Sequence, residues 1–387
     1  MGVSLNLRQV SRRSLIESAA VILFVSIGAW LALQLTPYAP QSTKTVMYSE
    51  ADETSSAKNS FVRATLVVLQ KDTALFELLE GPNLGRQVTA KIHLQTAQSI
   101  RTGDVVVLTD DNDGFTMQGL WRLPGVALLL LLFLVVVWVV GRRQGLFGIG
   151  GLAVSLLVVA LFILPNIAAG YDAFWVSVIG AYVIGLVSVG VAHGLNRHSL
   201  IAIIATLCSL TLVVFLAVIG AWMAKLTGVY DETTALMAYQ HPAVDFRGVL
   251  VGGIIIATLG VLDDIVMTQV SIVKELARAN PSYSRRKLYG RALAVGRDHI
   301  AAVVNTLALA YVGVSLSLIL AYTSFSGYAQ QSPLLLLNSE FVSQEVVRTL
   351  VSSIGLILAV PLSTLIAVVA YTKLYKKWYN SKRTLRN

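Results

Sequence analysis

Charged residues are scarce in this sequence. Asp, Glu, Lys and Arg make up only 13% of the 387 residues, whereas an average soluble domain has about 25%. Hydrophobic residues make up 55%, and the mean hydropathy is +0.70. Apolar runs of about 20 residues, the length that crosses a hydrocarbon core, recur through most of the chain. The composition excludes a single soluble globule and predicts a multi-pass membrane protein.

The scarcity of cysteine and the lack of a nucleotide-binding motif exclude further kinds of site. Cys208 is the one cysteine, so an intramolecular disulfide and a cysteine-based zinc site are both excluded. No GxxxxGK[ST] run is present, which argues against ATP as the energy source. The formal charge is +9, but the basic residues are distributed as in a membrane protein, so we expect no nucleic-acid partner. We also expect no metal and no cofactor.

Eight apolar stretches are long enough to cross a membrane as helices. They predict a mainly α-helical, polytopic transmembrane bundle with both chain ends on one side, and a small extracytoplasmic β domain after the first span. The expected spans cover residues 15–35, 124–140, 146–166, 173–193, 199–224, 248–272, 299–322 and 348–371. The expected parts are the tail with the first span (1–41), a linker (42–60), the β domain (61–123) and a seven-helix transmembrane domain (124–387).

Basic residues set the predicted orientation, because cytoplasmic loops collect Lys and Arg. With the N-terminus inside, nineteen of the thirty are cytoplasmic, and eight of the other eleven lie in the inserted segment. We therefore expect both termini in the cytoplasm. A cleaved signal peptide is the alternative for the first span, but its apolar run is longer than a usual signal and no clean A-x-A site follows.

The insert after the first span reads as a small barrel. Residues 87–94 alternate polar and apolar, as in a half-buried strand, and 61–69, 74–79 and 105–109 are further strand candidates. Four or five short strands predict an OB-like or SH3-like fold. The TDDNDG run, residues 109–114, reads as a hairpin turn. A calcium loop is the alternative, but the spaced ligands of an EF-hand are missing.

The sixth span contains two acidic residues, Asp263 and Asp264, and ionisable groups inside a bilayer are functional candidates. Asp264 shares a helical stripe with small and polar residues, so we expect this stripe to face other helices and Asp264 to be buried. The stripe comprises Gly253, Ala257, Gly260, Asp264, Thr268, Ser271 and Glu275. Asp263 points about 100° away and needs a partner from the seventh span or another subunit.

Two further spans repeat the small-and-polar pattern. The seventh carries Asp298, Ala301, Ala302, Asn305 and Ala308 on one side, and the eighth carries Ser352, Gly355, Ala359 and Ser363 beside Pro361. We expect a three-helix polar seam in which Asp263, Asp264, Thr268 and Asn305 relay protons or ions. Glu275, Asp298 and His299 form a possible gate at the cytoplasmic edge. The remaining candidates, expected to pack helices or line a pore, are Gly253, Gly260, Ser271, Ser352, Gly355, Pro361 and Ser363.

Simpler roles remain open for several of these residues. Hydroxyl, amide and glycine residues often only hold membrane helices together, and Asp298 with His299 can be an ordinary helix N-cap. The connection 273–298 is basic and amphipathic, with Asn280–Pro281 as the expected start of a helix lying on an anionic leaflet.

Three segments resemble the YibE/F family of bacterial multi-pass membrane proteins: GVLDDIVMTQVSIVKEL, GRDHIAAVVNTLALAYVG and NSEFVSQEVVRTLVSSIGLILAVPL. The resemblance covers essentially the whole chain and implies a bacterial cytoplasmic membrane. The sequence is more weakly similar to resistance-nodulation-division permeases and SecD/SecF, which implies that Asp263 and Asp264 are proton-relay acids. Eight spans and a very small outer domain depart from that pattern.

These observations favour a permease or exporter driven by protons or cations, and more transport than catalysis. One alternative is a scaffold or sensor that acts through its extracytoplasmic domain. Another is an intramembrane aspartyl hydrolase using Asp264 and Asp298, although the GxGD pattern is absent. Besides the lipid bilayer, the expected partners are a second copy or a related membrane protein.

Overall fold

The computed structural model describes residues 61–69, 73–81, 83–92, 100–111, 114–194, 196–324 and 332–384. The predicted first span and the linker lie outside these residues. The described chain divides into two compact units, one ending at Val140 and the other beginning at Gly141.

The first unit contains a closed five-stranded barrel. Its strands are β1 (Phe61–Leu69), β2 (Thr73–Leu78), β3 (Gln87–Lys91), β4 (Val105–Asp111) and β5 (Gly114–Leu120). Their order around the barrel is β1-β2-β3-β5-β4, with β3 and β5 parallel and the other pairs antiparallel. The small β domain is confirmed, and the position of β5 between β3 and β4 matches an OB-like barrel rather than an SH3-like one.

The barrel core follows the predicted alternation. Ala90 of β3 is buried between the exposed Thr89 and Lys91, and Phe76 and Leu108 fill the centre. Asp111 pairs with Gly114 in the antiparallel β4–β5 ladder, so β4 and β5 form a hairpin as predicted.

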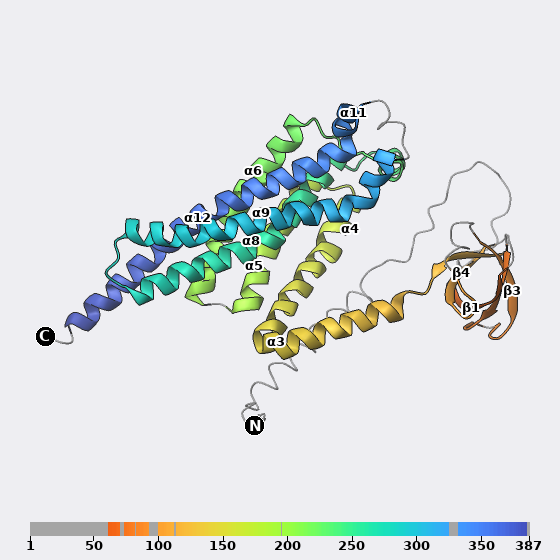
Figure 1. Cartoon of the computed structure of the whole chain (residues 1–387), viewed down its shortest axis with the longest axis horizontal. Coiled ribbons are helices and arrows are strands. Elements are labelled where there is room, and N and C mark those ends of the chain that lie inside the picture. The colour runs from red at the N-terminus through yellow and green to blue at the C-terminus, as the bar shows by residue number, and fades with distance from the viewer. Residues whose placement is uncertain are drawn as a thin grey trace, which may run out of the picture. The chain divides into compact units, whose positions relative to one another are not determined.

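The rest of the described chain is helical (Figure 1). The helices in chain order are α3 (Leu123–Val158), the π-helical turn η2 (Val159–Ile163), α4 (Leu164–Ala168), α5 (Ala173–His193), α6 (Arg197–Met223), α7 (Glu232–Gln240), α8 (Phe246–Ala279), α9 (Arg285–Ser324), α11 (Pro333–Asn338) and α12 (Glu340–Thr384). Side-chain caps begin several of them: Asp172 accepts from Trp175 N–H before α5, and Asn196 accepts from His198 and Ser199 N–H before α6.

Six of the described helices are long and apolar enough to cross a membrane. Each of the seven expected spans from residue 124 onward overlaps one of them, and the 46-residue stretch Leu123–Ala168 contains two. Arg142 interrupts that stretch with φ 50° and ψ −133°, at the boundary that the sequence predicted between them. The chain therefore has the helices of a membrane protein, while the number of spans and their orientation stay predictions.

The predicted surface helix between the sixth and seventh spans was wrong. Asn280 ends α8 instead of starting a new helix, and α9 begins at Arg285 and continues without a break to Ser324. Leu288 and Ala292 are buried in the bundle core. The apolar side of the basic segment therefore packs against other helices. The amphipathic pattern is the same for a membrane surface and for a bundle, so the sequence did not distinguish them.

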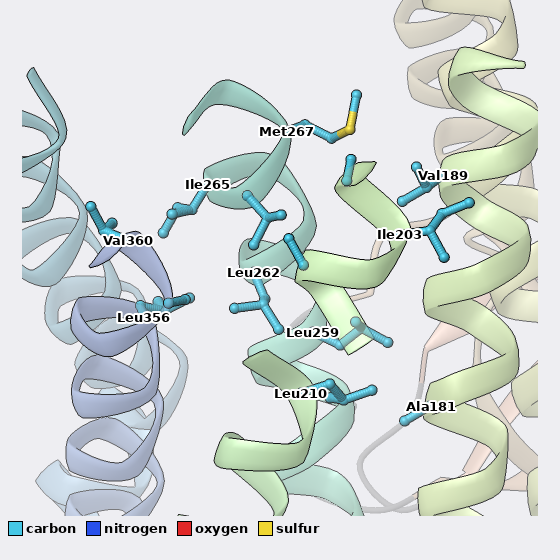
Figure 2. Close-up of a cluster of buried hydrophobic side chains, with 14 of the residues drawn as sticks. Ala181, Val189, Ile203, Leu210, Leu259, Leu262, Ile265, Met267, Leu356 and Val360 are labelled. Atoms are coloured by element: carbon cyan, nitrogen blue, oxygen red, sulfur yellow. The ribbon is translucent and has the colours of Figure 1, made fainter. Parts of the chain in front are cut away.

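Helices α5, α6, α8 and α12 supply most of the apolar core of the second unit. Figure 2 shows Ile265 of α8 directed toward Leu356 and Val360 of α12, with Met267 on the opposite side of α8. Helix α8 thus has neighbours on two sides, α12 on one and α5 on the other.

Candidate functional site

Helix α8 carries the candidate site, and glycines set its distance from α5. A Cβ atom built on Gly252 would lie 2.2 Å from Ser177 Oγ, and one on Gly248 would lie 3.2 Å from Ala173 Cβ. Both pairs are 75 residues apart, and the hydrogen-bonded pair Ser188 and Asp263 has the same separation. The two helices therefore run parallel in one register, which brings Ser188 beside Asp263.

Only one of the two carboxyl oxygens of Asp263 has a hydrogen-bond partner among the described residues. Ser188 Oγ donates a hydrogen bond of 2.9 Å to Asp263 Oδ2. Thr206 Oγ1 of α6 interacts with this carboxyl group. Asp263 Oδ1 and Thr206 Oγ1 are both buried, and neither has a partner at hydrogen-bond distance among the described residues. Buried polar atoms in proteins are almost always paired, so an unpaired carboxylate oxygen marks a place where a proton or cation can bind.

A cavity of about 520 Å³ opens beside this carboxyl group. It lies between α3, α5 and α8, and both Asp263 and Asp264 line it. The other polar residues of the lining are Ser155, Ser188 and His193, while most of the remaining lining is apolar or glycine. The sequence singled out the two aspartates, but not the α5 residues that complete the cavity.

The predicted burial of Asp264 was wrong. Asp264 is exposed, as are Gly253, Gly260 and Thr268 on the same stripe, and a Cβ built on either glycine would meet no atom within 4 Å. The contact face of α8 uses Gly248 and Gly252 instead. Small residues occur on more than one face of α8, so their spacing alone did not identify the packed face. Asp264 lies at the cavity, and Glu275 is exposed near the end of the helix.

The seventh span was predicted to join the polar seam, but its candidate residues lie elsewhere. Asn305, Asp298 and His299 are all exposed on α9, and none of them lines the cavity of the two aspartates. Asp298 and His299 lie in the middle of a continuous helix, which also excludes the N-cap interpretation. Among the described residues, no hydrogen bond joins Asp298 and Asp264, the two residues of the hydrolase alternative.

A polar seam between α8 and α12 does exist, with different α8 residues. Thr258 Oγ1 lies 2.7 Å from Ser352 Oγ, and Gln269 Nε2 donates to Thr364 Oγ1 at 2.7 Å and to the Ala292 carbonyl of α9 at 3.0 Å. Three predicted α12 residues are buried here: Ser352, Ser363 and Gly355, whose Cβ would lie 2.7 Å from Val213 of α6. Pro361 is partly buried.

A family model described as YibE/F-like protein matches residues 129–373, which is more than half of the chain. The chain belongs to the YibE/F-like family. The predicted membership is confirmed, although the match is shorter than expected. The matched range of this YibE/F-like protein includes the cavity helices α5 and α8 and leaves out the barrel. No curated protein and no solved structure matches the chain.

One junction in this YibE/F-like protein was missed by sequence reasoning. His198 of α6 is half-buried, with Nδ1 2.7 Å from the Tyr371 hydroxyl of α12 and Nε2 3.2 Å from Ser271 Oγ of α8. Ser271, a predicted packing residue, therefore helps to join three helices. A single His at the start of an apolar stretch gives no sequence signal for such a junction.

The arrangement suits binding and release of protons or cations. Its groups are carboxyl and hydroxyl oxygens beside a cavity with apolar walls, and a carboxyl group in such surroundings can change charge as its environment changes. No group of three or more His, Cys, Asp or Glu residues that could hold a metal ion is found among the described residues.

Proposed function

We propose that this YibE/F-like protein is an integral membrane permease or exporter, located in the bacterial cytoplasmic membrane, and driven by protons or cations that bind at Asp263. The observation that carries the proposal is the buried Asp263 Oδ1 without a partner, next to a cavity that also contains Asp264.

The cycle follows from the cost of a charge in a low-dielectric place. A charged Asp263 favours a hydrated cavity, whereas a neutral or cation-bound Asp263 allows α3, α5 and α8 to close around it. Protonation or cation binding thus shifts the population between two helix arrangements. Transport results when the two arrangements open to opposite sides of the membrane. Asp264, at the same cavity, would deliver the ion to Asp263.

The two aspartates have different roles within this proposal. Asp263 has a protein partner and a buried oxygen, whereas Asp264 is exposed. We therefore expect Asp263 to be the coupling group and Asp264 an accessory one. The other predicted relay and gating residues do not line the cavity, and their roles stay predictions: Thr268, Asn305, Glu275, Asp298 and His299.

Inverted membrane vesicles that contain the full chain test the proposal. Respiration acidifies their interior, and acridine orange reports proton release when K⁺, Na⁺, Ca²⁺ and then pools of small organic ions are added. We expect at least one addition to release protons in parent vesicles. Asp263→Asn should slow this release by about 100-fold, the lower end for losing a positioned proton-transfer group.

Asp264→Asn is the matched control, since it removes the same charge one residue along the helix, and we expect a smaller effect. Equal amounts of each variant in the membrane are verified by immunoblot. Unchanged proton release in Asp263→Asn would contradict the assignment of the coupling group. If no addition releases protons even in the parent, the result favours the scaffold or sensor alternative.

A further inference from the structure

Two adjoining cavities lie at the end of the bundle where α6 ends and α8 begins. Their volumes are about 540 and 690 Å³, and Trp222 and Arg247 line both of them. The first is also lined by Phe174, Val218, Ile219, Asp245, Gly248 and Val251, and the second by Met223, Lys225, Leu226 and Thr227. Shared lining residues make them one groove, which we call the α6–α8 groove. It is separate from the aspartate cavity.

The inner part of the groove is apolar and suits a hydrocarbon chain. Phe174, Val218, Ile219 and Val251 come from three different helices, α5, α6 and α8. Trp222 lies where the two cavities adjoin, and its exposed fraction is 69%. Tryptophan is enriched where the hydrocarbon core meets the headgroups, so we expect the groove mouth at headgroup depth.

The outer part of the groove is cationic. Neither Lys225 nor Arg247 makes an ion pair with any described residue, and both side chains are exposed. The neighbouring carboxylates accept hydrogen bonds from backbone N–H groups and form no ion pair with either cation. Asp245 Oδ1 accepts from the Arg247 backbone N–H as the cap of α8, and Glu340 accepts from the N–H groups of Thr227 and Gly228.

The Glu340 contacts also fix the rim of the groove. Gly228 has a φ of +84°, and a Cβ atom there would lie 2.2 Å from the Phe246 carbonyl oxygen. Only glycine fits this close approach. Lys225 is therefore presented from a turn whose backbone is held against both α8 and α12.

We infer that the α6–α8 groove binds an anionic phospholipid, with the phosphate between Lys225 and Arg247 and an acyl chain along the apolar wall. Charge complementarity favours an anionic head over a zwitterionic one, because two cations, Lys225 and Arg247, line the groove with a single carboxylate, Asp245. The N-terminus of α8 is already capped by Asp245, so the two side chains carry the recognition. This site is independent of the proposed transport function.

Fluorescence quenching of Trp222 tests the inference in the full chain. The protein is reconstituted in phosphatidylcholine vesicles that contain increasing fractions of phosphatidylglycerol or phosphatidylcholine with brominated acyl chains. Subtracting the signal of Trp222→Phe isolates the quenching of Trp222 from that of the other tryptophans. We expect half-maximal quenching at a several-fold lower fraction of brominated phosphatidylglycerol, with about a fivefold loss of preference for each removed cation.

The variants are Lys225→Gln, Arg247→Gln and the pair together, with Arg197→Gln at the opposite end of α6 as the matched control. Loss of the preference in the single and double variants, but not in the control, supports the lipid site. Equal quenching by both lipids in the parent would overturn it, and so would a double variant that keeps the preference. Removal of the preference by inorganic phosphate, but not by chloride of equal ionic strength, would show a site for free phosphate instead.

Discussion

The two sides of helix α8 contact their neighbours in different ways. Toward α12, the polar side chains of Thr258 and Gln269 each make a hydrogen bond of 2.7 Å inside a packed apolar core. Toward α5, Asp263 has one hydrogen bond, one unpaired oxygen and a cavity beside it. Paired groups stabilise one arrangement, while an unpaired carboxyl group leaves two arrangements available. The first side is therefore structural, and the second is where we expect chemistry.

The largest effect on stability should come from the glycines that determine which face of α8 is packed. Gly252→Ala places a methyl group against Ser177 and should lower the free energy of unfolding by about 1–3 kcal/mol. Gly253→Ala is the adjacent control, because a Cβ there meets nothing within 4 Å, and it should be neutral or stabilising by up to about 1 kcal/mol. Thermal unfolding in detergent measures both, and equal melting temperatures would refute the assigned face.

The α12 side can be weakened at its buried amide. Gln269→Met keeps the volume but removes two hydrogen bonds, so we expect a loss of about 1–2 kcal/mol. Gln269→Glu keeps an acceptor but loses the donor groups, and should be at least as destabilising. Proton release in the vesicle assay should change little at matched membrane levels of the Met variant. A complete loss there would show that this side also takes part in transport.

A smaller coupling should connect the two hydroxyls of the α8–α12 seam. In a double-mutant cycle, Thr258→Val and Ser352→Ala should be coupled by about 0.6 kcal/mol, the average for hydrogen bonds between membrane helices. Reversible unfolding of the four proteins in mixed micelles gives the coupling energy. Additive effects would mean that the two hydroxyls do not interact.

The smallest effect concerns a carboxylate that, unlike Asp263, has both oxygens paired, and whose side chain is 40% exposed. Arg63 Nε and Nη2 donate to Glu80 Oε2 in the barrel, and these hydrogen bonds lower the pKa of Glu80 below its ordinary value. The pair therefore stabilises β1 above the ordinary carboxylate pKa, and this contribution is lost as the pH falls through the lowered value.

Hydrogen exchange of peptides covering β1 in the full chain, corrected for intrinsic rates, follows this change. We expect faster exchange as the pH is lowered in the parent, and none of that extra pH dependence in Glu80→Gln. The effect should be small because an exposed ion pair contributes little. Identical pH profiles for the two proteins would remove the pair as a stabilising contact.

Much of the molecule could be predicted from local patterns. Residues 173–193 were predicted as one helix and form α5 with these bounds, because Asp172 caps its start and Gly194 follows its end. The barrel strand Phe61–Leu69 was likewise found from its apolar and β-branched residues. Length, composition and capping residues act within one segment, so they can be interpreted without knowing which other segments pack against it.

The sequence by itself determined the membrane class, the family, the long apolar helices and the two aspartates of α8. The tertiary structure decided which of these aspartates is held by a partner, and which face of α8 is packed. It also decided that the basic connection is part of α9. The physical reason is that Gly252 and Gly253 look equivalent along the chain, and only the position of Ser177 on a neighbouring helix distinguishes them.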